Sequence, residues 1–325
     1  MNNLDTILYL ANAEAKHYAP LRLDVILEEN IPRLIVKKKG DTYDVDIQGH
    51  QGHDNEGRAT TVVDFVKRAI LNNVDRKIDA TGVYPIELHD SYTYLDSKDS
   101  TKYKGCLTFS KNMKHRHTIN FPDPYQMGAY GGMLGIEDTV SFADKKNAVL
   151  FAGTTTGSKD VSKNARIEAC KWALDKRPQY EFLITQVAQI PENEIVANLG
   201  QDVWGKIKSK PIPHTDHFKY KYVFNVQGNT CGWSRVPMIL NSKSLMINWS
   251  HDDGTWYYPL LQENNQFVSV NNLNQLPSVV NFLDSNPGIV QLMTNNANRF
   301  VKQYCGQIHA AYYGKCLFEA MAANK

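Results

Sequence analysis

The sequence predicts an α/β protein made of two halves, each a mostly parallel sheet with helices on both faces. β-prone apolar runs alternate with amphipathic helical segments along most of the chain, which is the pattern of strands joined by crossover helices. The 325 residues are enough for two hydrophobic cores. Two such halves place a ligand between them, at the carboxyl ends of the strands.

The elements of the first half are predicted from hydrophobic period and turn residues. Apolar residues recur at helical spacing in the helices, and the hairpin alternates apolar and polar residues around a Gly40-Asp41 turn. Aromatic residues and turn formers mark the loop. In order, the predicted elements are a helix over 4–17, a hairpin over 33–47, a helix over 61–71, short strands over 84–88 and 105–109, and a loop over 122–135.

The second half is predicted from short buried runs that are followed by polar loops or by helical patterns. Pro287 begins a long helix, a position where proline is favoured because the N–H it lacks would have no partner there. The predicted strands are 147–153, 180–190, 223–226, 245–247 and 267–270. The predicted helices are 165–176, 234–240, 276–283, 287–304 and 308–322.

Composition narrows the classes of function. Lys and Arg number 36 against 34 Asp and Glu, without basic runs, which argues against nucleic acid as a partner. The five cysteines lack paired spacing, so we expect reduced, buried thiols rather than disulfides or a zinc site. The N-terminus lacks the pattern of a signal peptide, and no apolar run reaches the length of a membrane span. These features predict a cytoplasmic protein.

Residues 217–259 carry the strongest signal for a ligand site. A buried strand over 223–226 is followed by Gly228, which allows the backbone to approach a ligand closely. Ser234 and Arg235 stand where a helix begins, and backbone N–H groups beside an arginine suit a phosphate or diphosphate. An ordinary strand–helix unit with a surface arginine explains the segment equally well, so both interpretations stay open on this evidence.

A second candidate is the loop after the strand over 147–153. Gly153 and Gly157 can bring the main chain close to a ligand, and the hydroxyl of Thr156 can donate to phosphate oxygens. Arg166 lies in the helix that follows. The spacing matches neither a P-loop nor a dinucleotide fingerprint, and an ordinary loop is the simpler interpretation of this motif alone.

Acidic residues provide two further candidates. Asp90 follows the strand over 84–88, where a carboxylate could act as a general base; a solvated loop acid is the alternative. Asp44 and Asp46 imitate a metal-binding DxD motif. They lie in a polar–apolar alternation that places both on a solvated strand face, and a metal site needs further convergent ligands.

Several motifs follow one another in a fixed order along the chain. They are residues 84–90, 107–111 and 120–122, residues 151–157 with Arg166, and His217, residues 219–222, Phe224, Asn225, Gly228, Ser234, Arg235, Tyr258 and Pro259. This ordered set resembles the signature of glycosyltransferase family 90. That family includes the Rumi-like protein O-glucosyltransferases and the fungal capsule-associated xylosyltransferases.

The resemblance implies a GT-B type fold, two Rossmann-like domains facing a central cleft, with C-terminal helices. The expected parts are an acceptor-side domain over 1–145, a nucleotide-sugar-binding domain over 146–300, and a C-terminal helix over 301–325 packing back on the N-terminal domain. It also implies an inverting, metal-independent transfer of xylose or glucose from a UDP-sugar to a glycan hydroxyl. The expected partners are therefore that donor and an oligosaccharide or glycan acceptor, without a further cofactor.

The resemblance also implies roles for particular residues. Asp90 would be the general base that deprotonates the acceptor hydroxyl. Arg235 and Arg166 would stabilise the charge that builds on the leaving diphosphate, a task for preorganised cations where no metal is used. The residues expected to line the diphosphate are Gly153, Thr156, Gly228 and Ser234.

The chain departs from the family pattern at three positions near the expected donor. Ala152 replaces an arginine, Gln227 stands where an acid or arginine is usual, and Thr255 replaces a glutamate. These departures favour one alternative, a non-catalytic UDP- or sugar-binding protein that keeps the fold. A metal-dependent glycosyltransferase using Asp44 and Asp46 is the other. Without a secretory signal, glycan synthesis of a bacterial or viral type in the cytoplasm is expected.

Overall fold

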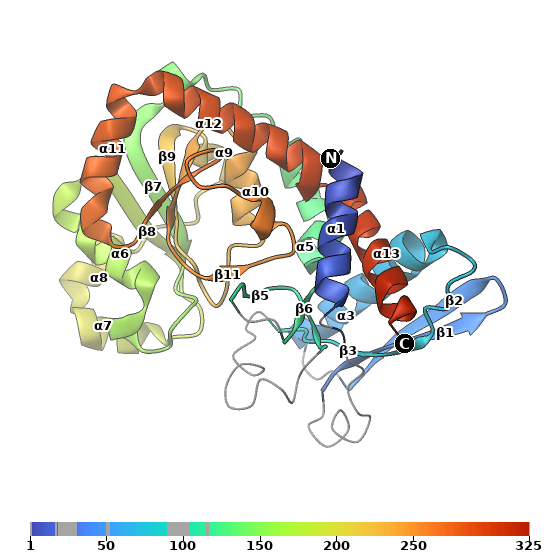
Figure 1. Ribbon diagram of the computed structural model, residues 1–325. Helices are drawn as coiled ribbons and strands as arrows, with labels where there is room; N and C mark the ends of the chain where they lie inside the picture. Colours follow the sequence, from blue (N-terminus) through green and yellow to red (C-terminus); the bar gives the residue numbers. More distant parts are fainter. Residues whose placement is uncertain are drawn as a thin grey trace. The chain divides into compact units, whose positions relative to one another are not determined.

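The computed structural model describes residues 2–16, 18, 31–49, 53–89, 105–114 and 117–324. The chain forms two compact units (Figure 1). Unit 1 comprises Met1–Gly131, Asp252–Pro259 and Gln303–Lys325, and unit 2 comprises Gly132–His251 and Leu260–Lys302. The domain ranges expected from the sequence stay a prediction, because a compact unit is not necessarily a domain that folds alone.

Unit 2 is built around a parallel sheet with the strand order β12-β10-β9-β7-β8. Numbered along the chain, the five strands follow the doubly wound order 2-1-3-4-5. The predicted parallel sheet with flanking helices is therefore confirmed in this unit. The strands are β7 (Lys146–Thr154), β8 (Tyr180–Gln186), β9 (Tyr220–Asn225), β10 (Leu245–Trp249) and β12 (Val268–Val270).

Strand β7 is apolar along most of its length because both of its faces are covered. Val149 and Phe151 point into the main core of unit 2, whereas Leu150 and Ala152 belong to a smaller cluster with Tyr220. A continuous apolar run is what a buried parallel strand requires. The helices of unit 2 are η4 (Phe142–Asp144), η5 (Val161–Lys163), α6 (Ala165–Ala173), η6 (Leu174–Lys176), α7 (Glu192–Leu199), α8 (Gln201–Ile207), α9 (His214–His217), α10 (Arg235–Leu240), η8 (Leu273–Gln275), α11 (Leu276–Ser285) and α12 (Pro287–Phe300).

Unit 1 has shorter strands and mainly antiparallel pairing among its described residues. The predicted hairpin is confirmed, and its strands join a third in the order β2-β1-β3. Parallel pairing is limited to β4 with β6 and to a bridge between Ile86 and Leu107. The strands are β1 (Arg33–Lys39), β2 (Thr42–Gln48), β3 (Gly82–Pro85), β4 (Leu107–Thr108), β5 (Lys111–Asn112), β6 (Ile119–Asn120) and β11 (Asp253–Gly254).

The first and last helices of the chain pack together in unit 1 (Figure 1). Tyr313, Leu317 and Phe318 of the last helix are fully buried, so the C-terminal segment completes the core of this unit. The helices are α1 (Asn3–Ala15), α3 (His53–Phe65), η1 (Val66–Ile70), η2 (Leu71–Asn73), α5 (Pro124–Met127) and α13 (Gln307–Ala323). The chain passes between the units in η3 (Ala129–Gly135), between His251 and Asp252, in η7 (Tyr258–Leu260) and in η9 (Val301–Cys305).

Among the segments that differ from the sequence-based prediction, two have a clear local cause. Residues 122–135, expected to form a loop, contain the short helices α5 and η3, because the side chain of Asp123 caps α5 and Pro124 begins it. Helices α7 and α8 were not predicted. They are short and meet at Gly200, which has φ +81°, and this break weakens any helical period across the segment.

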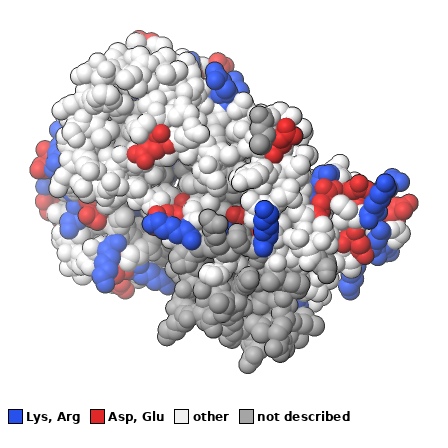
Figure 2. Space-filling view, viewed as in Figure 1, with Lys and Arg blue, Asp and Glu red and all other residues white. Residues whose placement is uncertain are grey.

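All five cysteines are buried free thiols, as expected. None of the helices in the described ranges has the length and apolar character that a bilayer crossing requires. On the face shown in Figure 2, basic and acidic side chains are interspersed. That distribution resembles neither the broad basic surface of a nucleic-acid-binding protein nor a strongly acidic one.

Candidate functional site

The candidate site lies where the winding of the unit 2 sheet reverses. Strands β7 and β9 are neighbours there, although β8 separates them along the chain. In doubly wound sheets, ligands bind at this point, outside the carboxyl ends of the strands. The loops after the two strands meet, since the backbone N–H of Gly157 donates to Oδ1 of Asn229 at 3.0 Å.

Arg166, on α6, connects the two loops. Its Nη1 donates to the carbonyl of Thr154 at 3.2 Å and to Oγ1 of Thr156 at 2.6 Å. Its Nε donates to the carbonyl of Gln227 at 3.1 Å. The residue is 8% exposed. A single guanidinium therefore fixes the carboxyl end of β7 relative to that of β9.

Arg235 begins α10 and reaches back to the same strand end. Its Nη2 donates to the carbonyl of Ala152 at 2.8 Å, and its Cζ lies 5.2 Å from the centre of the Phe151 ring. That contact is in the range of a cation–π interaction. The two arginines thus bind carbonyls only two residues apart on β7, those of Ala152 and Thr154.

The electrostatics of this pair favour an anionic ligand. Burial lowers the pKa of Arg166 to about 9, with a further contribution from the positive charge of Arg235. Burial also lowers the pKa of Arg235 to about 10. Both remain protonated near neutral pH, yet no carboxylate in the described part of the chain forms an ion pair with either. An anion held between them would offset both the desolvation and the mutual repulsion.

Two glycines make room for the guanidinium groups. A Cβ on Gly153 would lie 2.8 Å from Nη2 of Arg235, and a Cβ on Gly228 would lie 2.6 Å from Oγ1 of Thr156 and 2.8 Å from Nη2 of Arg166. Both distances are shorter than real Cβ contacts. The sequence predicted glycines that let the main chain approach a ligand, and the structure shows that they also let arginine side chains approach the main chain.

Three further polar side chains near this site were given no role on sequence grounds. Nδ1 of His217, Oδ1 of Asn225 and Oε1 of Gln227 are buried without a hydrogen-bond partner among the described residues. Burial lowers the pKa of His217 to about 4, and the positive charges of Arg235 and His214 contribute smaller shifts in the same direction. The imidazole is therefore neutral at pH 7. The sequence feature that could have identified them is a histidine before a buried apolar strand and an asparagine at its end, His217 and Asn225.

The structure brings together most of the predicted site residues. Ser234, at the start of α10, directly precedes Arg235 and is partly buried. Asp90 lies outside the described residues, so its role stays a prediction. The residues that converge at the ends of β7 and β9 are Gly153, Thr156, Arg166, Gly228 and Arg235.

The two acids of the DxD motif are exposed on β2. Oδ1 of Asp44 lies 3.2 Å from Nζ of Lys67, and Oδ2 of Asp46 accepts a hydrogen bond from Gln48. Within the described ranges, no group of three or more histidine, cysteine or acidic side chains is placed to hold a metal ion.

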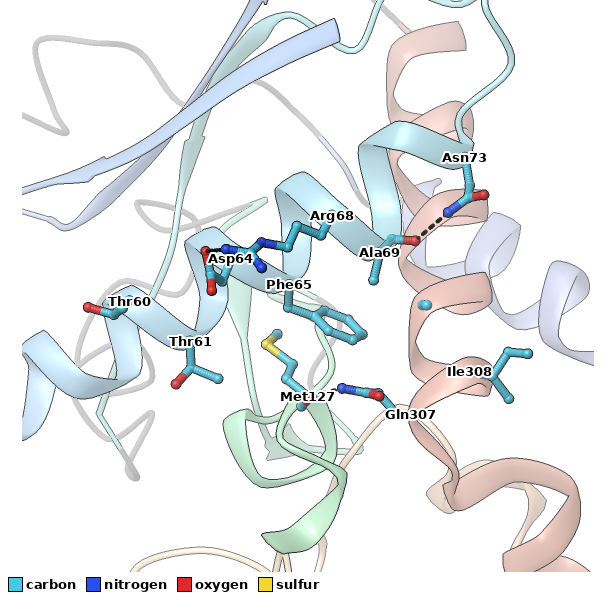
Figure 3. A pocket seen from close by; sticks show the side chains of 11 residues that line it. Thr60, Thr61, Asp64, Phe65, Arg68, Ala69, Asn73, Met127, Gln307 and Ile308 are labelled. Atoms are coloured by element: carbon cyan, nitrogen blue, oxygen red, sulfur yellow. Dashed lines mark hydrogen bonds and ion pairs between the residues drawn. The ribbon is translucent and has the colours of Figure 1, made fainter. Parts of the chain in front are cut away.

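A separate cavity of about 610 Å³ lies in unit 1. Phe65 and Met127 contribute apolar atoms to it, and Arg68 and Gln307 contribute polar ones (Figure 3). None of the residues that line it belongs to the motifs that resemble the family signature, so it is not part of the candidate site.

A doubly wound α/β unit with two arginines converging at its switch point is an arrangement suited to an anionic ligand. The chain belongs to glycosyl transferase family 90, whose model matches residues 138–321, more than half of the sequence. That range contains the whole five-stranded sheet of unit 2 and every arginine and glycine of the candidate site. A search of curated proteins finds no match.

Solved structures give distant similarities. TarM is 11% identical, with a TM-score of 0.36 over 50% of this chain and 33% of that chain. The C-terminal domain of a glycosyl transferase group 1 family protein (LpcC) from Francisella tularensis is 13% identical, with a TM-score of 0.32 over 49% of this chain and 87% of that chain. The match thus spans about a third of the TarM chain.

Proposed function

We propose that this protein is an inverting, metal-independent glycosyltransferase that moves xylose or glucose from a UDP-sugar to a glycan hydroxyl. Membership of glycosyl transferase family 90 supports sugar transfer. The observation that carries the more specific proposal is the pair formed by Arg166 and Arg235, two protonated groups without an acidic partner among the described residues at the switch point of unit 2.

A nucleoside diphosphate is the anion that suits such a pair. When the bond between the anomeric carbon and the diphosphate breaks, negative charge develops on the leaving oxygen. Two fixed guanidinium groups stabilise that charge more in the transition state than in the ground state, which is what lowers the barrier. In this proposal they supply the positive charge that a metal ion provides in other transferases.

The acceptor chemistry is assigned to Asp90. Its carboxylate takes the proton of the acceptor hydroxyl, whose oxygen attacks the anomeric carbon from the face opposite UDP. One carbon–oxygen bond forms as the bond to the diphosphate breaks, so the configuration inverts and UDP leaves with the bonding pair. This role is supported by the family resemblance alone, because Asp90 lies outside the described residues.

Two alternatives have specific support. Ala152, Gln227 and Thr255 depart from the family pattern, which favours a protein that binds UDP or a sugar without transferring it. Oγ1 of Thr255 is buried without a partner among the described residues, in place of the usual acid. A metal-dependent transferase using Asp44 and Asp46 has weaker support, because Asp44 already forms an ion pair with Lys67.

The experiment compares wild type, Arg235→Ala and Arg235→Lys for UDP binding by thermal shift, and for hydrolysis or transfer with UDP-xylose and UDP-glucose. Arg235→Ala should lower kcat/KM by about 10²–10³-fold. Arg235→Lys should recover part of the loss, because it keeps the charge but not the planar fork. Arg299→Ala, an exposed arginine on α12 of the same unit, is the matched control. Unchanged kinetics in Arg235→Ala would exclude its proposed role.

The same assay separates the alternatives. Asp90→Asn should still bind UDP but lose transfer. Wild-type protein that is stabilised by UDP yet inactive with every donor and acceptor supplied supports the binding protein. Activity that disappears in a chelator and returns with a divalent cation supports the metal-dependent enzyme.

A further inference from the structure

A cavity of about 460 Å³ in unit 2 lies apart from the arginine site. It is bordered by α6, by the end of β10 and by η8, and it shares no residue with the converging arginines and glycines. Its volume is in the range of small-molecule sites. The side chains of Asn225 and Asn248 are hydrogen-bonded to each other on one face of the sheet. Trp249 is the next residue on β10, so its side chain points to the opposite face, and the cavity that it lines lies there too.

Two indole rings shape this cavity. Trp249 stacks on the buried ring of Phe224, with centroids 6.3 Å apart and planes inclined by 20°, and this half-buried side chain also lines the cavity. Its Nε1 donates to the carbonyl of Asn271, and Nε1 of Trp172 donates to Oδ1 of Asn274, both at 3.3 Å. Since both indole N–H groups are already bonded, the rings are held in place. Nζ of Lys176 lies 4.6 Å from the centre of the Trp172 ring, and Trp249 is therefore taken as the platform.

Polar groups surround these rings. Glu168 and Lys171 are exposed on the same side of α6, at a spacing that often forms an ion pair. Within the described ranges, neither side chain forms an ion pair or a hydrogen bond. The side-chain N–H₂ group of Asn272 adds two donors, because its Oδ1 is the atom already engaged. The rim thus offers donors and acceptors with no net charge.

We propose that this cavity is a second, non-catalytic binding site for neutral carbohydrate, separate from the donor site. A pyranose has an apolar C–H face that packs on an indole, and a ring of hydroxyl groups that both donate and accept hydrogen bonds. The cavity presents the complementary surfaces, a tryptophan platform within a polar rim that has no net charge. A nucleotide diphosphate fits poorly, because the rim has one ammonium group, that of Lys171, and the carboxylate of Glu168 offsets its charge.

The test titrates the full chain with xylohexaose, cellohexaose and maltohexaose, followed by tryptophan fluorescence and calorimetry. Trp249→Leu keeps apolar contact with Phe224 but removes the platform, and should weaken binding roughly tenfold. Glu168→Gln with Lys171→Met changes only exposed side chains, so it tests the rim without affecting folding, and it should also weaken binding severalfold. Arg235→Ala is the matched control. It should abolish binding of UDP and leave oligosaccharide affinity unchanged.

This test does not depend on the proposed catalytic activity, because binding is measured without turnover. A binding protein that transfers no sugar could still confirm the cavity, and an active transferase could still refute it. The proposal is overturned if none of the three oligosaccharides binds at about 10 mM, or if both cavity variants bind as well as wild type. It is also overturned if oligosaccharide binding is lost in Arg235→Ala, since the sugar would then occupy the donor site.

Discussion

The two units differ in the kind of ionisable group that they bury without an oppositely charged ion-pair partner among the described residues. In unit 2 these groups are basic: burial lowers the pKa values of Arg166, Arg235 and His217. In unit 1 they are acidic: burial raises the pKa values of Glu87 and Asp123. Oδ2 of Asp123 has no hydrogen-bond partner among the described residues. The buried basic groups of unit 2 thus suit an anion. The buried carboxyl groups of unit 1 take up a proton more readily than exposed ones, because their pKa values are raised.

This difference agrees with the two substrates of the sugar transfer proposed above. A diphosphate donor needs fixed positive charge, and an acceptor hydroxyl needs a group that accepts its proton. Each unit carries an electrostatic cost, because a buried charge without a partner destabilises the folded state. Stability should therefore respond to pH in opposite directions in the two units.

The largest expected effect is that of His217. Its pKa is about 4 in the folded protein and near 6.5 when unfolded. The neutral imidazole therefore imposes no cost on folding above pH 6.5. As the pH falls from 6.5 towards 4, the free energy of unfolding should decrease by roughly 3 kcal/mol, because the unfolded chain takes up the proton more readily. Urea unfolding at pH 7.5 and 4.5 should show that His217→Gln removes most of this loss. His214→Gln, an exposed neighbour, is the control, and equal pH dependence in His217→Gln and wild type would refute the prediction.

A slightly smaller effect of opposite sign is expected from Asp123. Burial raises its pKa from 3.8 to about 6, so the folded state is favoured below pH 3.8 and loses stability as the pH rises to about 6. The change is somewhat under 3 kcal/mol. In Asp123→Asn the free energy of unfolding should change less between pH 4 and 7 than in wild type. Asp41→Asn, at an exposed turn, should behave as wild type, and a matching pH profile for Asp123→Asn would contradict the burial argument.

The smallest effect concerns close packing at glycine. In unit 2, Gly153 and Gly228 make room for guanidinium groups, whereas in unit 1 Gly314 makes room for hydrocarbon. A Cβ on Gly314 would lie 2.4 Å from Cδ1 of Ile70. Gly314→Ala should therefore destabilise the protein by about 1–2 kcal/mol, despite the better helix propensity of alanine.

Thermal or urea unfolding would measure this cost, and Ile70→Val, which deletes Cδ1, should relieve it in the double variant. Gly205→Ala on α8 is the matched control, because no atom lies within 4 Å of its added Cβ and a gain of up to about 1 kcal/mol is expected. A Gly314→Ala protein as stable as Gly205→Ala would show that Ile70 moves aside freely.

Local patterns were sufficient to predict most of the fold of unit 2. Strand β7 and helix α6 were found because an apolar run, a glycine loop and an amphipathic stretch follow one another within a short segment. Helices α7 and α8 escaped prediction, since each is short and Gly200 interrupts the period between them. The short helix α5 was taken for a loop, because aromatic residues and turn formers outweighed its Asp-Pro start.

The candidate site could be predicted only in part. Arg166 and Arg235 were identified as a pair by resemblance, but their contacts depend on β9 lying beside β7, and strand order is not a local property of sequence. The hydrogen bonds from Arg166 to Thr154 and Gln227 follow from that order. The burial of His217 likewise comes from tertiary packing, which no period of apolar residues reveals.

The route of the chain through the two units has a consequence for the order of folding. Unit 1 needs α13, which follows every strand of unit 2 along the chain, because Tyr313, Leu317 and Phe318 belong to its core. Every strand of unit 2 has been synthesised by residue 270. Although domains usually fold from the N-terminus during synthesis, here the later unit can complete its sheet first. Helix α1, which packs on α13, therefore gains this partner only after every strand of unit 2 has been synthesised.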